Sequence, residues 1–148
     1  MHYELWAPTE YWELSEKDRQ KFRCGPGRGI LEKLVPDKWR LGWPLVKTLC
    51  ITPSCAIHDF CYAWGPDTID WKNESDRVFR NNLIRQITAA ARDYSYFYFF
   101  ITRARLMKAE IYYQFVVQFG GPSFWDGRNP QNEMADPFSD KIWNPILT

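Results

Sequence analysis

The stretch CAIHDFCY, residues 55–62, places a histidine beside an aspartate, with a cysteine three residues away on each side. Imidazole titrates near neutral pH, so His58 can take a proton from water and return it. An adjacent carboxylate, here Asp59, can hold a hard cation. On a helix, neighbouring side chains point about 100° apart, so both can reach one cleft in different roles. Cys55, His58 and Tyr62 share one stripe of such a helix.

Three other interpretations of this stretch stay open. A lone His–Asp pair is commonly a partly exposed polar pair. The cysteines can be buried apolar fillers. A zinc site would need His58 with Cys50, Cys55 or Cys61, but Cys55 and Cys61 lie six residues apart and the chain has no CxxC pair. The sequence therefore favours zinc only weakly.

Upstream, residues 22–29 read FRCGPGRG, with three glycines in five positions and a proline among them. This composition predicts a tight turn with an accessible backbone. Such a turn can aim several carbonyl oxygens at one point, and calcium takes about 6–8 oxygen ligands. An ordinary Gly/Pro loop is the alternative, and a Walker phosphate loop is excluded because no GKS or GKT follows.

Downstream, residues 73–79 read NESDRVF. Asn73 and Ser75 are candidate helix caps, and acids are favoured in a first helical turn. Asp76 is therefore either a first-turn acid or a carboxylate that orients His58 and stabilises its protonated form, as in hydrolytic triads.

The joint order of these segments resembles the phospholipase A2 superfamily: a glycine loop, Cys-x-x-His-Asp-x-x-Tyr, and an Asp opening a second helix. The sequence HDF with a tyrosine two residues on is most similar to the compact bacterial and fungal enzymes. The CGPG at 24–27 is also similar to the calcium loop of the parvovirus capsid domain. The resemblance covers about residues 22–84.

The resemblance implies a role for each catalytic position. His58 would be the general base that activates water to attack the sn-2 ester of a phospholipid. Asp76 would steady His58, and the hydroxyl of Tyr62 would support that pair. Retention of the whole set favours an active enzyme over a silent scaffold.

The resemblance also implies calcium as the cofactor. Asp59 and the backbone carbonyls of Arg23, Gly25 and Gly27 would hold it. The backbone N–H of Gly25 would help to stabilise the developing oxyanion.

Four cysteines allow three pairings. The resemblance implies a Cys24–Cys55 disulfide that ties the loop to the catalytic helix, which leaves Cys50 and Cys61 paired or as thiols. In a reducing cytoplasm all four can be thiols. The separation of the loop from His58 is longer than in animal secreted enzymes, so residues 28–50 look inserted.

Length and charge limit the function further. A chain of 148 residues is expected to form one domain, residues 1–148. The net charge of +1 and the lack of a basic cluster argue against nucleic acid as a partner. Aromatic residues make up 18% of the chain, and KWRLGWPLVK at 38–47 suits either a lipid headgroup boundary or a loop over the core. A peripheral phospholipid interface is the expected partner, and a protein partner or homo-oligomer stays open.

The first ten residues lack the apolar core of a signal peptide, and no apolar run approaches the length of a membrane span. We therefore expect the chain to be cytoplasmic as synthesised, with export by another route left open.

We predict a mainly α fold, in which a phospholipase A2-like core at about 22–92 has two antiparallel helices and a glycine-rich calcium loop. The helices are expected over about 52–64 and from 73 or 74 to 92. Residues 94–101, YSYFYFFI, suit a strand by composition, but a helix that reaches Phe119 is favoured. Residues 97–100 are interpreted as core packing, and 121–148 as an irregular tail.

The function that these expectations favour is calcium-dependent hydrolysis of the sn-2 ester of phospholipids by a histidine-activated water. The alternative is a catalytically silent phospholipase A2-like binding or inhibitor protein, with a phage or mobile-element origin left open.

Overall fold

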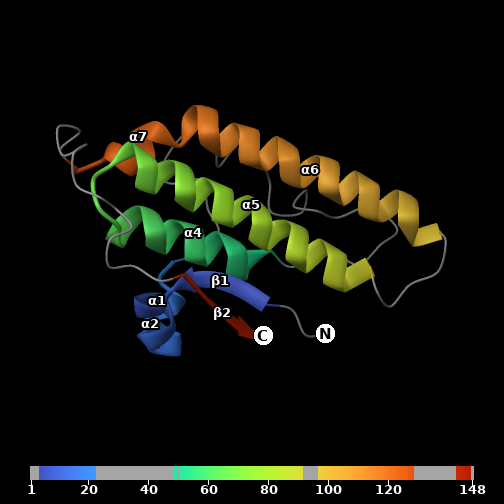
Figure 1. Ribbon diagram of the computed structural model, residues 1–148, viewed down its shortest axis with the longest axis horizontal. Helices are drawn as coiled ribbons and strands as arrows, with labels where there is room; N and C mark the ends of the chain where they lie inside the picture. The colour runs from blue at the N-terminus through green and yellow to red at the C-terminus, as the bar shows by residue number, and fades with distance from the viewer. Residues whose placement is uncertain (1–3, 23–48, 50, 92–96, 129–142, 148) are drawn as a thin grey trace.

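The computed structural model describes residues 4–22, 49, 51–91, 97–128 and 143–147. Its elements, in chain order, are β1 (Glu4–Pro8), α1 (Thr9–Glu13), α2 (Glu16–Arg19), α4 (Thr52–Trp64), α5 (Ile69–Ala91), α6 (Phe97–Phe119), α7 (Gly121–Trp125) and β2 (Trp143–Leu147). The described part is mainly helical, as the sequence predicts (Figure 1).

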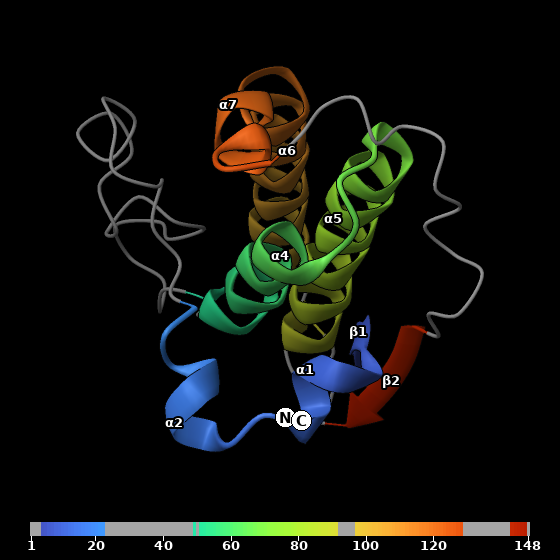
Figure 2. The same ribbon diagram turned by 90° about the vertical axis from the view of Figure 1, so that its left-hand side faces the viewer.

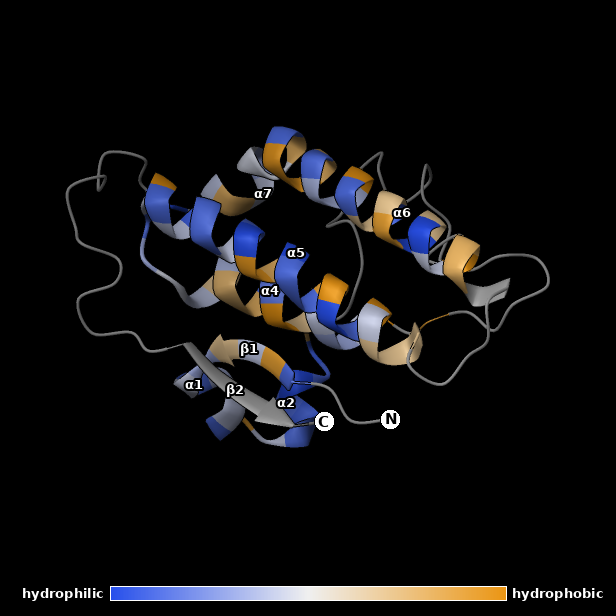
Figure 3. Cartoon of the chain, turned by 45° about the vertical axis from the view of Figure 1, so that its right-hand side comes forward, coloured by the Kyte–Doolittle hydropathy of each residue, from blue (hydrophilic) through white to orange (hydrophobic). Residues whose placement is uncertain are grey.

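Three helices form the body of the molecule. Helix α5 packs against both α4 and α6, and successive helices run in opposite directions (Figures 1 and 2). Strands β1 and β2 pair antiparallel on the side of α4 and α5 away from α6, with Trp6 opposite Pro145. Polar and apolar residues alternate along α5 and α6, as expected for helices with one face on a core (Figure 3).

Helix α4 forms where the sequence predicts it. Pro53 occupies its first turn, where a missing backbone N–H does no harm. Gly65 ends it, and its N–H donates to the carbonyl of Cys61. The indole of Trp71 packs so closely on Gly65 that a Cβ there would lie 1.6 Å from Trp71 Nε1. Only glycine therefore fits at the end of α4.

Helix α5 begins earlier than predicted, and Asp76 is not a first-turn acid. The helix starts at Ile69, and the hydroxyl of Thr68 accepts a hydrogen bond from the N–H of Trp71. Ser75 is not a cap, because its hydroxyl donates to the carbonyl of Trp71, one turn back. Asp76 therefore lies two turns inside α5, where its side chain faces the core.

Two other expectations are wrong. The tail predicted as irregular contains α7 and β2. Within the described part of the Phe-rich run, Phe99 and Phe100 are exposed, Phe100 to 63%, whereas the sequence favoured core packing. The expected helix over this run is confirmed from Phe97, and it ends at Phe119 as predicted.

The core has two apolar clusters. One gathers residues of β1, α1, α4, α5 and α7 around Trp71 and Phe124. The other gathers residues of α4, α5 and α6 around Leu83 and Ile87. The ring of His58 contacts Tyr62 of the first cluster and Phe79 of the second, with ring centroids 4.1 and 4.8 Å apart. The histidine therefore lies at the junction between the clusters.

Asn82 attaches β1 to α5. Its side chain is fully buried, accepts a hydrogen bond from the N–H of Trp6 and donates one to the carbonyl of Trp6, at 2.9 and 2.8 Å. The amide thus takes the place of a neighbouring strand along that edge of β1.

We expect Asn82→Ala to lower the free energy of unfolding by about 1–3 kcal/mol, because it leaves two partly buried backbone groups of Trp6 without their partner. Urea denaturation followed by circular dichroism measures the change. The half-buried neighbour Asn81 provides the matched control, and Asn81→Ala should change stability by about 0.5 kcal/mol or less. Equal losses in the two variants would contradict this role.

Candidate functional site

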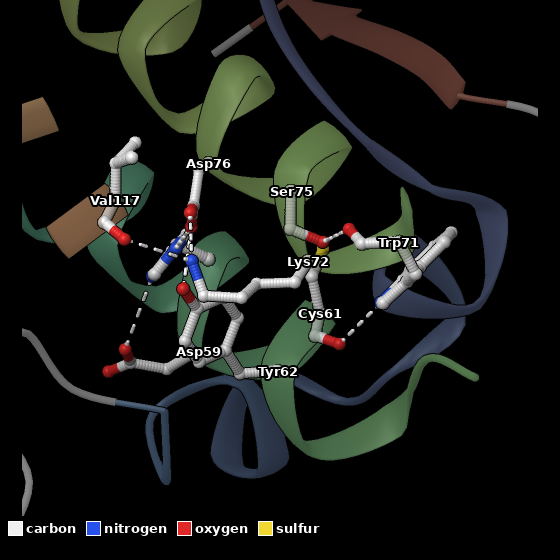
Figure 4. Close-up of polar contacts among 9 residues, drawn as sticks. Asp59, Cys61, Tyr62, Trp71, Lys72, Ser75, Asp76 and Val117 are labelled. Atoms are coloured by element: carbon white, nitrogen blue, oxygen red, sulfur yellow. Dashed lines mark hydrogen bonds and ion pairs between the residues drawn. The ribbon is translucent and has the colours of Figure 1, made fainter. Parts of the chain in front are cut away.

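Four side chains from two helices meet in the core. His58 and Tyr62 lie one turn apart on α4, and Lys72 and Asp76 lie one turn apart on α5. Since residues four apart share a helix face, each helix presents one pair to the other. Figure 4 shows the side chains of Tyr62 and Lys72 directed at the carboxylate of Asp76.

Asp76 is the centre of this cluster. It is 0% exposed, and both of its carboxylate oxygens are hydrogen-bonded. Oδ1 lies 2.8 Å from His58 Nε2 and accepts a hydrogen bond from the hydroxyl of Tyr62 at 2.6 Å. Oδ2 accepts one from Lys72 Nζ at 2.7 Å. A buried carboxylate needs such partners, because an unpaired charge in the core is strongly destabilising.

The contact with Asp76 sets the tautomer of His58. An ionised carboxylate can only accept hydrogen bonds, so the ring must carry its proton on Nε2 when it is neutral. Nδ1 then has the lone pair. It faces Asp59, whose Oδ1 is 3.9 Å away, and the side chain of Asp59 is 36% exposed. The basic nitrogen of the ring therefore lies on the side of the partly exposed carboxylate of Asp59.

The protonation equilibria reflect this arrangement. Burial lowers the pKa of His58, but the two carboxylates outweigh burial, so the pKa stands above its ordinary value of 6.5. Burial raises the pKa of Asp76. Hydrogen bonds from His58, Lys72 and Tyr62, together with the charge of His58, have the larger effect, so the pKa of Asp76 stands below its ordinary value. Burial and the charge of Asp76 raise the pKa of Tyr62. The cluster thus favours a protonated tyrosine and an ionised aspartate.

The structure brings together the predicted residues that it describes. His58, Asp76 and Tyr62 are in direct contact, and Asp59 lies at the other edge of the imidazole. The predicted loop residues Arg23, Cys24, Gly25 and Gly27 lie outside the described residues.

Asp59 is suited to a hard cation. Its carboxylate supplies oxygen donors, which calcium prefers, and it is partly exposed beside the histidine. The described residues contain no group of three or more His, Cys, Asp or Glu side chains that could hold a metal. The predicted site differs from such a group, because it has one carboxylate and the remaining ligands are backbone carbonyls.

The states of Cys55 and Cys61 limit the possible disulfides and the possible zinc ligands. Cys55 is in a disulfide, and its partner lies outside the described residues. Cys61 is buried as a thiol, so it does not pair with Cys50. A disulfide sulfur is not the thiolate that zinc binds, which removes Cys55 from the zinc alternative. The implied Cys24–Cys55 pairing stays a prediction.

Lys72 is the member of the cluster that the sequence reasoning missed. It is 4% exposed, which is rare for lysine and requires a partner. Its signal in the sequence is the spacing of four residues to Asp76. That spacing predicts a contact between Lys72 and Asp76 only if the helix already includes Lys72, and the sequence predicts that it starts at Asn73 or Glu74.

Comparison with known proteins gives no match among family models, curated proteins or solved structures. Within the described residues, no helix combines the length and apolarity needed to cross a membrane.

Proposed function

We propose that this protein is a phospholipase A2-like hydrolase that cleaves the sn-2 ester of phospholipids at a membrane interface. The observation that carries the proposal is the buried contact of His58 Nε2 with Asp76 Oδ1 at 2.8 Å, with Tyr62 on the same oxygen. A base oriented by a buried carboxylate is the arrangement that activates water in hydrolytic triads.

The side chains divide the proton chemistry among them. Asp76 holds the proton of the neutral ring on Nε2, so Nδ1 of His58 can accept a proton from a water molecule as that water attacks the ester. The imidazolium that forms is stabilised by Asp76, and the proton can then pass from Nδ1 to the leaving alkoxide. Tyr62 keeps Oδ1 of Asp76 in place through its 2.6 Å hydrogen bond.

In this proposal Asp59 holds calcium together with the carbonyls of Arg23, Gly25 and Gly27. The ion, when bound, supplies polarisation of the ester carbonyl and a positive charge near the oxyanion. The partly exposed carboxylate of Asp59 beside Nδ1 supports this role. The N–H of Gly25 remains the proposed oxyanion donor.

The direct test is a release assay. Mixed phospholipid vesicles are incubated with the protein in millimolar calcium or in chelator, and free fatty acid is measured. Calcium-dependent release of the sn-2 fatty acid is expected. An absence of release at any calcium concentration would refute the proposal.

We expect Asp59→Asn to remove the heat of calcium binding in titration calorimetry, because a neutral amide replaces the only charged ligand of the proposed set. Asp70→Asn is the matched control, since Asp70 is an exposed acid at the start of α5. That variant should bind calcium as the wild-type protein does. Equal heats for Asp59→Asn and the wild-type protein would exclude Asp59 as a ligand.

A catalytically silent binding or inhibitor protein is the second candidate. The observation that favours it is burial: the residue His58 is only 7% exposed, and its ring packs between Tyr62 and Phe79. In that case the buried polar cluster around Asp76 would stabilise the fold and would have no catalytic role. Vesicle binding without ester release would support this function in place of the first.

A further inference from the structure

The buried amine of Lys72 joins two parts of the molecule. Nζ donates to Asp76 Oδ2 at 2.7 Å and to the backbone carbonyl of Val117 at 3.5 Å. Its side chain reaches from α5 toward the last turn of α6, as Figure 4 shows. A lysine this deeply buried is tolerated where its charge is paired and hydrogen-bonded.

The end of α6 is suited to a cation. The last four carbonyls of a helix have no partners within the helix, and they carry partial negative charge. Helix α6 ends at Phe119, and the carbonyl of Val116 accepts a hydrogen bond from the N–H of Gly120 at 2.7 Å. The next carbonyl, that of Val117, accepts from Lys72. Lys72 therefore lies between the negative end of α6 and the carboxylate of Asp76.

The same end of α6 also contacts the other partner of Asp76. A Cβ at Gly120 would lie 2.7 Å from the hydroxyl of Tyr62 and 2.4 Å from the carbonyl of Val116. Glycine alone therefore allows this close approach. The hydroxyl that would be displaced is the one that donates to Asp76 Oδ1.

We propose that the C-terminal turn of α6 is part of the active site and that Lys72 is the positioning residue that couples this turn to Asp76. Lys72 holds Oδ2, so that Oδ1 is directed at both His58 and Tyr62. Gly120 keeps the hydroxyl of Tyr62 on the same oxygen. The kinetic consequences of this inference depend on the proposed function, whereas its consequences for stability depend on the contacts alone.

The polar side chains in contact with Asp76 come from two helices of the described part. Helix α4 contributes His58 and Tyr62, and α5 itself contributes Lys72. Helix α6 contributes a backbone carbonyl that contacts Lys72, and β1 meets α5 through the neutral Asn82. The pKa of Asp76 is lowered, so its ionised form stabilises the fold above the unfolded-state pKa of about 3.9. This contribution is lost as the pH falls through the folded-state pKa.

The test compares Lys72→Met, which removes the charge but keeps the chain length, with Lys72→Arg, which keeps the charge. Unfolding free energies of both variants and the wild-type protein are measured from pH 7 to pH 3. The deficit of Lys72→Met should be largest at neutral pH and should shrink below about pH 4 as Asp76 is protonated. Lys72→Arg should restore part of the stability. Loss of methylene packing alone would give a deficit that does not change with pH, which would overturn the inference.

Kinetics give the second readout. We expect Lys72→Met to lower kcat about tenfold with little change in KM, because the carboxylate that orients the base loses a charged partner. Arg77→Met is the control, since it removes an exposed cation that pairs with Glu74 on the same helix. An unchanged kcat in Lys72→Met would overturn the positioning role.

Gly120→Ala tests the α6 turn without a change of charge. It should lower kcat by displacing the hydroxyl of Tyr62, whereas Gly121→Ala, where a Cβ meets nothing within 4 Å, should not. Equal activity of the two variants would overturn the role of the turn.

If the wild-type protein releases no fatty acid, the proposed function fails, and the pH dependence of stability still decides the role of Lys72.

Discussion

His58→Gln is expected to lower the rate of ester release by about 10²–10⁴-fold and to leave the fold intact. Glutamine cannot take up a proton near neutral pH, so the attacking water would lose its base. The amide can still donate a hydrogen bond toward Asp76, which limits the disturbance of the buried carboxylate. Fatty acid release from vesicles gives the rate, and circular dichroism with thermal melting confirms the fold.

The chain offers a matched control for this substitution. It has two histidines, and the other is His2. His2→Gln makes the same chemical change at a residue that has no proposed role in catalysis, so it should retain wild-type turnover. If His58→Gln also turned over at the wild-type rate, His58 would not be the base.

Asp76→Asn is expected to cause the largest loss of stability, about 3–5 kcal/mol at neutral pH. The neutral amide leaves the amine of Lys72 buried without a counter-charge, since Lys72 Nζ is 2.7 Å from Asp76 Oδ2. Folded proteins of this kind have only about 5–15 kcal/mol of stability in total. The variant should therefore unfold at a clearly lower urea concentration, and turnover should fall as well.

Two further variants separate charge pairing from other effects. Asp70→Asn removes an exposed acid from the same helix and should change stability by about 0.5 kcal/mol or less. The double variant Lys72→Met/Asp76→Asn removes both charges and should recover much of the stability that Asp76→Asn loses. A double variant as unstable as the sum of the two single variants would contradict the importance of the ion pair.

Part of the site could be predicted from local sequence. The helix that carries His58 has a proline at its start and a glycine at its end, so its limits were predictable. The spacing of His58 and Tyr62 by four residues predicts a shared helix face. The contact between these residues and Asp76 needed the resemblance to a family, because nothing local indicates which helix faces will meet.

Lys72 and the strands could not be found in the same way. The sequence predicts the start of α5 too late, because Asn73 and Ser75 are its candidate caps, and Lys72 lies outside a helix that begins there. In the structure α5 starts at Ile69, and the hydroxyl of Thr68 accepts a hydrogen bond from its first turn. The strands β1 and β2 are five residues each and pair across almost the whole chain. A short strand of this kind depends on its distant partner and on Asn82, and neither is visible in its own residues.

The pairing of Glu4 with Leu147 brings the first and last described segments of the chain side by side. A short linker could join Leu147 to Glu4, and new ends could then be opened elsewhere at the surface. The same pairing makes the two-stranded sheet a contact of very long sequence separation. Its formation should therefore come late in folding, after the three long helices have assembled.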